Sequence, residues 1–435
     1  MSTQGSDLFT VDGYDFHDGI FTAHYTMVAG QEFTKLSERI DFGAVEAKFT
    51  PQPPLLRLLT LAASLSYYKA TSVTKIKVNF GLTDIERFFF EQLIQNGLAE
   101  FAYRNDLPHK LVPEIIAGSH QTETVQRAWD TSGRPLVAVG GGKDSVVTIE
   151  ALKAAEKDPL LFSVNQFDPI DRCVAVSGCD YVQVQRTLDP QLRAMNARGA
   201  RNGHVPVTAI NSIIGLVAAD LAGLGPLVMS NESSASSGNL FWRDANIEVN
   251  HQWSKSLEFE DLLRSTLEGS GLEADRYFSL LRSLREIDIA ERFAGYPQYF
   301  SGFTSCNRSF TLDPAERATA WCCECPKCLF VYLILAPFLP KSELGAIFGA
   351  DLLDNTDNVA LFEEILGIRG NKPFECVGEF AEAAEALSKL SQDPEWSSSA
   401  VVIALAHAEL PVAPPETQIA SRVPERFWEA RNVAR

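Results

Sequence analysis

The sequence lacks any apolar run long enough to cross a bilayer. Its longest cleanly apolar run covers residues 329–339, whereas a membrane-spanning helix needs about 20 such residues. A longer apolar stretch, residues 209–229, is interrupted by Asn211 and Asp220 and is broken by Pro226. We interpret that stretch as a buried helix leading into a strand, and we expect no membrane partner.

The N-terminus lacks the basic and apolar segments that make up a secretory signal peptide. We therefore expect a cytoplasmic protein, in which thiols stay reduced. Four of the eight cysteines fall within residues 322–328. In a reducing compartment, such a group indicates free, metal-bound or catalytic thiols rather than disulfides.

Basic residues are scarce, with 38 Lys and Arg against 56 Asp and Glu, which gives a net charge of −18. Proteins that bind nucleic acid through its phosphates usually carry a basic stripe, so we expect no nucleic-acid partner. Hydrophobic residues make up 46 % of the 435 residues. This composition is ordinary for a globular protein, and the length predicts two or three domains; the oligomeric state cannot be read from it.

The hydrophobic pattern divides the chain into four regions and predicts an α/β fold. Residues 1–129 begin with a β-hairpin that turns at Asp18-Gly19, become helical over 54–96, and end in a polar connector. Residues 130–265 alternate short apolar strands with helices, which predicts a parallel, doubly wound sheet. Its expected strands are 135–139, 160–164, 173–176, 181–184 and 226–229, and its expected helices are 143–157 and 207–222. Residues 266–390 form a mainly helical region with the cysteine cluster, and 391–435 a helix and a Pro-rich tail.

A glycine-rich loop follows the first strand expected in residues 130–265. Glycines let backbone N–H groups approach phosphate oxygens closely, and the positive end of the following helix lies at the same place. Lys143 adds a cation, Asp144 offers a ligand for Mg²⁺ and Ser145 offers a hydroxyl. The candidate ATP-binding residues here are Gly140, Gly141, Gly142, Lys143, Asp144 and Ser145. By themselves, three glycines are also consistent with a plain strand-to-helix turn.

The full hexapeptide resembles the SGGxDS signature of the PP-loop ATP pyrophosphatases, which have a HUP-like fold. One departure is Gly140, which stands where that signature has serine. Neither the Walker A spacing nor G-x-G-x-x-G is present. The resemblance implies cleavage of ATP between its α- and β-phosphates and adenylylation of a substrate.

Three further segments contain polar residues suited to a site. Asn231 and Glu232 follow an expected strand, where ligands of open α/β sheets bind, and are further candidates for binding ATP. His204 lies just before the expected helix 207–222, and an isolated histidine there is also consistent with a structural role. His251 and Lys255 are four residues apart, so on a helix they would share a face, either as a site or as a solvated surface.

The cysteine cluster predicts a zinc site. Cys322-Cys-Glu-Cys-Pro-Lys-Cys328 contains overlapping C-x-x-C units, and another cysteine lies upstream. Four thiolates suit tetrahedral zinc. The expected ligands are Cys306, Cys322, Cys325 and Cys328, with Cys323 as a substitute for Cys322. The run resembles the zinc site of the PP-loop 7-cyano-7-deazaguanine synthases, while an Fe–S cluster and buried or redox-active thiols stay open as alternatives.

Several blocks together resemble the UDP-N-acetylmuramoyl-L-alanyl-L-glutamate epimerases of the MurL type. They are residues 66–69, 100–105, 140–145, 202–210, 230–233, 249–256, 305–308, 325–328 and 372–379. The resemblance implies epimerisation of the terminal L-Glu of UDP-MurNAc-L-Ala-L-Glu to D-Glu for peptidoglycan. ATP and Mg²⁺ would be consumed through an adenylylated carboxylate, with release of AMP and pyrophosphate and without pyridoxal phosphate.

This chemistry needs groups that move protons and groups that bind anions. The candidate acid/base residues are His204, His251, Lys255, Cys306 and Cys376. Cys306 cannot easily serve as both zinc ligand and base, so its two roles compete. Arg104, Arg308 and Lys372 are candidates for binding the substrate's carboxylates or diphosphate, although a surface ion pair is the better explanation for any one of them. Two other functions stay open: another PP-loop reaction on a nucleobase, and an ATP sensor without chemistry.

Overall fold

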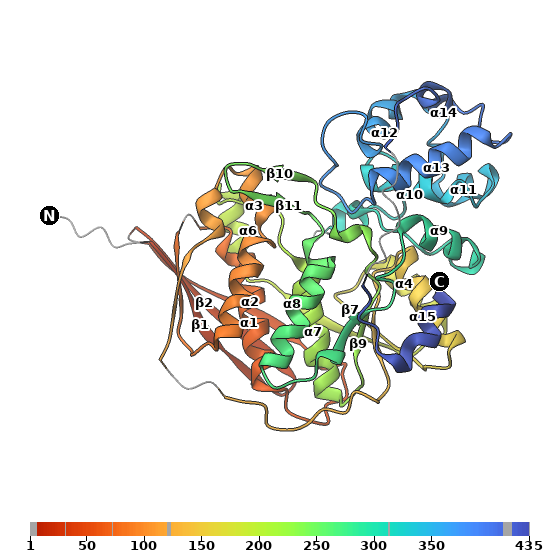
Figure 1. The fold of residues 1–435 in the computed structure, drawn as a ribbon. Coiled ribbons are helices and arrows are strands. Elements are labelled where there is room, and N and C mark those ends of the chain that lie inside the picture. The colour runs from red at the N-terminus through yellow and green to blue at the C-terminus, as the bar shows by residue number, and fades with distance from the viewer. Residues whose placement is uncertain are drawn as a thin grey trace.

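The computed structural model describes residues 7–30, 32–71, 73–119, 123–311, 314–411 and 420–434. Its central feature is a ten-stranded mixed sheet in the order β12-β9-β6-β7-β8-β3-β2-β1-β4-β5 (Figure 1). The strands of this sheet are β1 Leu8–His17, β2 Ile20–Ala29, β3 Glu32–Asp41, β4 Lys75–Val78, β5 Glu114–Ala117, β6 Leu136–Ala138, β7 Leu160–Val164, β8 Tyr181–Thr187, β9 Leu227–Met229 and β12 Tyr277–Ser279. A separate hairpin pairs β10 Leu240–Trp242 with β11 Ile247–Val249.

Helices cover the sheet and form the C-terminal region, so the α/β fold with a helical C-terminal part is confirmed. The helices are α1 Pro53–Tyr68, α2 Asp84–Gln95, α3 Ala99–Arg104, α4 Lys143–Ala154, α5 Asp168–Ser177, α6 Pro190–Ala197, α7 Val207–Ala222, α8 Leu257–Gly269, α9 Glu286–Ala294, α10 Pro326–Leu335, α11 Lys341–Phe348, α12 Val359–Ile365, α13 Phe380–Gln392, α14 Ala400–Leu405 and α15 Trp428–Ala434. The predicted Pro-rich tail falls largely on residues 412–419, outside the described ranges. Over the described part of the chain, no helix has both the length and the apolar character needed to cross a membrane.

The N-terminal hairpin forms where the sequence predicts it. Asp18 and Gly19 connect β1 to β2 with φ values of 51° and 74°, the left-handed conformation that tight hairpin turns require. The hairpin is part of the main sheet, because β3 pairs antiparallel with β8. Residues 1–129 and residues 130–265 therefore contribute strands to one continuous sheet.

The predicted strand over residues 173–176 is wrong, because these residues lie in α5. Pro169 occupies the first turn of this helix, and Gly178 ends it with φ 68°. Ile170, Cys173 and Ser177 are buried at helical spacing. The short apolar run 173–176 is therefore one face of an amphipathic helix.

Three short strands lie where the sequence predicts helix or connector. β4 interrupts the helical prediction over 54–96, β5 falls in the polar connector, and β12 falls in the mainly helical region. Each has only three or four residues, too few to show an alternating pattern in sequence. They form because a neighbouring strand offers free backbone groups: β4 pairs with β1, β5 with β4, and β12 with β9.

The parallel strands contribute to a hydrophobic core on each side of the sheet. Adjacent residues point to opposite faces, so Leu136, Phe162 and Leu227 pack on one side with α1 and α7. Val137, Leu161 and Val228 pack on the other side with α4, α5 and α9. The carboxyl ends of these strands therefore stay clear of the two helical layers, and the candidate site begins there.

The C-terminal helices α10 to α14 lie beyond one end of the sheet, and α15 returns to pack on α4 (Figure 1). α10 is buried against α9, α12 and α13. The segment between α12 and α13 carries Lys372 and Cys376 back towards the sheet, where Asn239 donates a hydrogen bond to the carbonyl of Pro373.

Candidate active site

The glycine-rich loop joins β6 to α4, and Gly142 is the N-cap of that helix. Gly141 has φ +75°, and a side chain there would lie 2.9 Å from the backbone of Pro169. Its carbonyl accepts a hydrogen bond from the Thr304 backbone N–H at 3.0 Å. The loop is therefore held tightly between α5 and the segment leading to Cys306, with the start of α4 facing the site.

The charged residues of the loop are already paired. Lys143 is buried and forms ion pairs with Asp144, at 2.5 Å, and with Glu286. Although burial would lower the pKa of Lys143, these two carboxylates raise it. The Ser145 hydroxyl donates to the Gly142 carbonyl at 2.9 Å, so in this conformation it stabilises the loop.

Three carboxylates gather beside the loop. Oxygen atoms of Asp144, Glu232 and Glu286 lie within 4.8 Å of one another. Glu232 follows β9, and Glu286 begins α9 shortly after β12, so both lie beyond the carboxyl ends of neighbouring parallel strands. Burial raises the pKa of Glu232, and repulsion from Glu286 and Asp144 adds to it. Such a group suits a divalent cation with a preference for oxygen ligands.

Glu286 is the residue of this group that sequence reasoning missed. Burial would raise its pKa, but Lys143 and Lys327 lower it instead. No glycine-rich or polar motif surrounds it, and β12 is too short to be predicted. The available signal was an acidic residue in the first turn of a helix, which is common in helices that bind nothing.

A buried lysine near this group has no partner among the described residues. Lys372 is 5 % exposed, and its ammonium makes no hydrogen bond there. Burial lowers its pKa, while Glu379, Glu382, Glu232 and Glu286 act in the opposite direction. A desolvated cation without a partner is costly, so the Lys372 ammonium is a candidate for binding an anionic group.

A thiol lies on the same segment, between two cationic side chains. The Lys255 ammonium donates to Cys376 Sγ at 3.3 Å, and His251 also hydrogen-bonds this thiol. Burial would raise the pKa of Cys376, but Lys255 and His251 outweigh it and lower the pKa to about 5. Lys255 also interacts electrostatically with Glu232 and Asp144, so its ammonium is influenced by both the thiol and the carboxylates.

His251 and Lys255 do not lie together on a regular helix, which was the condition for the two side chains to share a face. Asn250 makes a turn with Gln252 and Trp253, and a 3-10 turn, Trp253–Lys255, precedes α8. Ser256 caps α8, so the regular helix begins only after Lys255. Both side chains nevertheless reach Cys376.

A carboxylate and a second histidine lie behind His251. Glu100 Oε2 is 2.5 Å from His251 Nδ1 and 3.7 Å from His204 Nδ1. Burial would lower the pKa of His251, but Cys376 and Glu100 raise it to about 9. The pKa of His204 is lowered to about 3, mainly by burial and to a smaller extent by repulsion from His251. Lys69 secures the segment before His204 through Asn202 Oδ1 at 2.6 Å.

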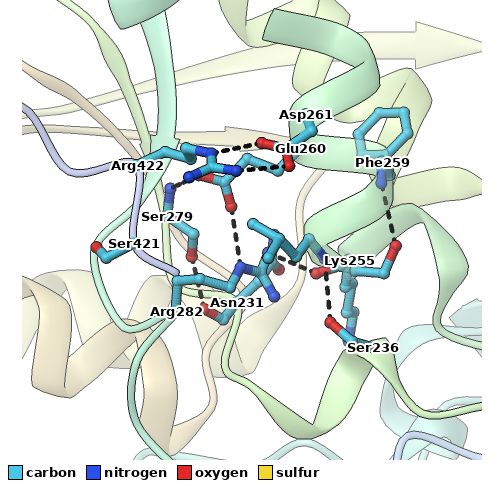
Figure 2. A network of polar contacts seen from close by, with 12 residues as sticks. Asn231, Ser236, Lys255, Phe259, Glu260, Asp261, Ser279, Arg282, Ser421 and Arg422 are labelled. Carbon is cyan, nitrogen blue, oxygen red and sulfur yellow. Dashed lines mark hydrogen bonds and ion pairs between the residues drawn. The ribbon is translucent and has the colours of Figure 1, made fainter. Parts of the chain in front are cut away.

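A buried ion pair fixes the backbone of two site segments. Figure 2 shows Arg282 beside Glu260, close to Lys255 and Asn231. The guanidinium is 2.9 Å from Glu260 and donates to the carbonyls of Glu232 and Lys255 at 2.6 and 2.7 Å. Both charged side chains are fully buried. The Ser279 hydroxyl bonds the Asn231 carbonyl at 2.6 Å, so Asn231 enters this network through its backbone.

The four predicted zinc ligands lie together. The sulfur atoms of Cys306, Cys322, Cys325 and Cys328 lie within 4.8 Å of one another. Cys322 and Cys325 are 3.6 and 3.4 Å from Cys328, close to the spacing of roughly 3.8 Å expected for thiolates around one tetrahedral zinc ion. Cys323 turns away, with its sulfur 3.2 Å from the Phe348 carbonyl. The arrangement places Cys306 with the cluster and away from a role as free base.

The two candidate arginines are more exposed. The side chain of Arg104 is 53 % exposed, pairs with Glu100 at 2.7 Å and lies over the ring of Phe374. Arg308 is 55 % exposed and pairs with Glu324 at 2.7 Å, beside the cysteine cluster. Arg104 therefore lies beside Glu100, the carboxylate that also pairs with His251, whereas Arg308 forms a surface ion pair.

Family models match most of the chain. The model described as the MurL N-terminal domain matches residues 2–280, and that of the MurL C-terminal domain matches residues 302–420. No solved structure matches the chain.

Curated relatives carry the name UDP-N-acetyl-alpha-D-muramoyl-L-alanyl-L-glutamate epimerase. The protein of Micromonospora sp. is 47 % identical over 381 residues, covering 86 % of this chain and 80 % of its own. The protein of Salinispora tropica is 46 % identical, covering 86 % and 78 %. The protein of Xanthomonas oryzae pv. oryzae is 38 % identical, covering 89 % and 86 %.

Proposed function

This chain belongs to the MurL family of epimerases, and from this premise we propose that it converts the terminal L-Glu of UDP-MurNAc-L-Ala-L-Glu to D-Glu for peptidoglycan synthesis. We further propose that ATP and Mg²⁺ drive the reaction through an adenylylated carboxylate. The observation that carries this mechanism is the group of Asp144, Glu232 and Glu286 beside the glycine-rich loop. Family membership favours this function over a nucleobase substrate or an ATP sensor.

Activation solves the chemical difficulty of the reaction. The α-hydrogen of a carboxylate is a poor acid, because its removal places two negative charges side by side. Attack of the α-carboxylate on the α-phosphorus of ATP releases pyrophosphate and gives a mixed anhydride. The carbonyl of this anhydride can accept the electron pair as an enolate. Hydrolysis after epimerisation then yields AMP and the free carboxylate.

The loop and its neighbours have the properties that adenylylation needs. The backbone N–H groups of residues 140–142 and the start of α4 can bind phosphate oxygens. Mg²⁺ bound by the three carboxylates would neutralise charge on the phosphates, and a cation there would relieve the repulsion that raises the pKa of Glu232. The unpartnered ammonium of Lys372 is suited to a substrate carboxylate.

Zinc at the four cysteines would serve the structure of the site. The donor set is all thiolate with tetrahedral spacing, and such sites are closed to substrate. Cys306 follows the segment whose Thr304 binds the Gly141 carbonyl. A zinc ion bound by Cys306, Cys322, Cys325 and Cys328 would therefore support the position of the glycine-rich loop.

The test uses the purified full-length protein with UDP-MurNAc-L-Ala-L-Glu, ATP and Mg²⁺. We expect AMP and pyrophosphate to form only when the dipeptide substrate is present, together with D-Glu after acid hydrolysis. Formation of ADP and phosphate would contradict adenylylation. Absence of D-Glu under conditions that release pyrophosphate would contradict the epimerase function.

A further inference from the structure

Three of the acid/base candidates, His251, Lys255 and Cys376, meet at one sulfur atom. Glu100 from α3, His251 from the turn before α8, and Cys376 from the segment before α13 form a continuous hydrogen-bonded chain. Lys255 contacts the same sulfur at 3.3 Å. A buried carboxylate that orients an imidazole, which in turn pairs with a thiol, is an arrangement that holds a thiolate.

Lys255 connects the hydrogen-bonded chain of Glu100, His251 and Cys376 to the carboxylates beside the glycine-rich loop. It donates a hydrogen bond to Cys376 and interacts electrostatically with Glu232 and Asp144. Lys372, four residues before the thiol, has a buried ammonium without a partner in the described structure and lies in the field of Glu232 and Glu286. A glutamate with one carboxylate activated at the carboxylates and another bound by Lys372 would have its α-carbon near Cys376.

We propose that the Cys376 sulfur is the base that removes the α-proton of the adenylylated glutamate, with Glu100, His251 and Lys255 as its positioning residues. This inference rests on the proposed function, since it requires an activated carboxylate. Cys376 is partly exposed, as a base that must reach a bound substrate has to be. Of the other candidates, Lys255 and His251 are protonated partners of the thiolate, and His204 lies behind His251 with ring centroids 4.6 Å apart.

The step conserves atoms and charge. The thiolate takes the α-proton and becomes a thiol, while the C–H electron pair forms the C=C bond of the enolate and negative charge moves to the carbonyl oxygen. The enolate is then protonated on its opposite face by a proton that derives from water. The thiol returns its own proton to water, so one proton leaves the α-carbon and one enters.

The experiment separates activation from proton transfer. Substrate-dependent exchange of labelled pyrophosphate into ATP measures adenylylation, and uptake of deuterium from D₂O at the α-carbon measures proton transfer. Both are measured for the wild-type protein, Cys376→Ser, Cys376→Ala and the control Cys179→Ser. The Cys179 thiol donates a hydrogen bond to the Ser177 carbonyl at the end of α5, and Cys179 is not one of the groups named above.

We expect both Cys376 variants to keep pyrophosphate exchange within a few-fold and to lose deuterium uptake by about 10²–10⁴-fold, the usual contribution of a general base. Retained exchange also shows that the variants are folded. Cys179→Ser is expected to behave as wild type. Absence of pyrophosphate exchange in the wild-type protein would instead refute the proposed function.

Three results would overturn the inference while leaving the proposed function intact. One is normal deuterium uptake in Cys376→Ala. Another is the loss of both activities in the two Cys376 variants, which would assign the thiol to activation or binding. The third is an acyl group on Cys376 in the intact mass after acid quenching, because a thioester would make the sulfur a nucleophile.

Alkylation of the wild-type protein gives an independent readout that does not depend on a variant folding. At pH 6, iodoacetamide should label the peptide of Cys376 at least tenfold faster than that of Cys179, and His251→Asn should shift the labelling of Cys376 to higher pH. Equal labelling rates in the wild-type protein would contradict a thiolate at Cys376.

Discussion

The glycine-rich loop offers a comparison between neighbouring glycines, because only one is constrained by its backbone. Gly141 has φ +75°, and an added Cβ would lie 2.9–3.1 Å from the backbone of Pro169 and Ile170. Gly140 has no heavy atom within 4 Å of the same position and has no positive φ. Gly141→Ala should therefore disturb the loop, whereas Gly140→Ala and Gly140→Ser should not.

The size of the effect follows from two costs. An alanine in the left-handed region costs about 1–2 kcal/mol, and backbone atoms of α5 cannot move aside as a flexible side chain would. If the loop shifts to avoid this strain, each lost hydrogen bond between an N–H and a charged phosphate costs about 1.5–3 kcal/mol. We therefore expect Gly141→Ala to weaken ATP binding roughly 10- to 150-fold per lost bond.

Calorimetric titration with a non-hydrolysable ATP analogue and Mg²⁺ measures this effect, and urea unfolding shows whether strain stays in the fold. Gly140→Ala and Gly140→Ser should bind within about twofold of wild type. The reasoning fails if Gly141→Ala binds normally with unchanged stability. It also fails if Gly140→Ala loses as much affinity as Gly141→Ala.

Three other predictions test the surroundings of the site. Arg282→Met should lower the free energy of unfolding by about 3–5 kcal/mol in urea, because the buried charge of Glu260 then has no cation beside it. Arg422→Met, which removes an exposed ion pair with Asp261, should lower it by at most about 1 kcal/mol. Equal losses in the two variants would contradict the role of burial. Cys325→Ser should abolish bound zinc by elemental mass spectrometry and Cys323→Ser should not, and loss in both would refute the four-ligand assignment. The rate of deuterium exchange should rise as the pH increases through about 5, where Cys376 loses its proton, and should fall as the pH passes about 9, where His251 loses its proton. A rate that does not change near these two pH values would contradict the pairing of Cys376 with His251. The titratable groups facing this pair are Glu100, His204, Lys255, Lys327 and Glu375.

The sequence predicted those parts of the fold that depend on residues close together in the chain. The hairpin turn at Asp18-Gly19 requires left-handed backbone, and few residue pairs supply it. The bounds of α7 matched the predicted helix 207–222, because a long apolar stretch between Pro206 and Gly223 leaves little choice. The glycine-rich loop was recognisable because its function needs consecutive residues.

Other parts depend on contacts between distant segments. β4, β5 and β12 have too few residues for a visible period, and they form by pairing with strands already present. The spacing of Glu100 and His251 is 151 residues, and that of Lys255 and Cys376 is 121. No local sequence pattern shows that such distant residues are in contact. The sequence therefore identified several candidates for the catalytic base but could not rank them.

Some site residues could be found from a local sequence motif, and others only from the structure. Cys306, Cys322, Cys325 and Cys328 were found from spacing because three of them lie in one short run. Glu286 was missed because it has no motif, and its importance arises only from the carboxylates that β9 and α4 place beside it. Arg308 was included for its charge, which a surface pair with Glu324 explains.

The most direct test of the account is one incubation of the protein with UDP-MurNAc-L-Ala-L-Glu, ATP and Mg²⁺ in D₂O. We expect D-Glu that carries deuterium at its α-carbon, with at least one AMP and one pyrophosphate formed for each inverted residue. Inversion without AMP, or AMP without exchange at the α-carbon, would contradict an epimerase that works by adenylylation.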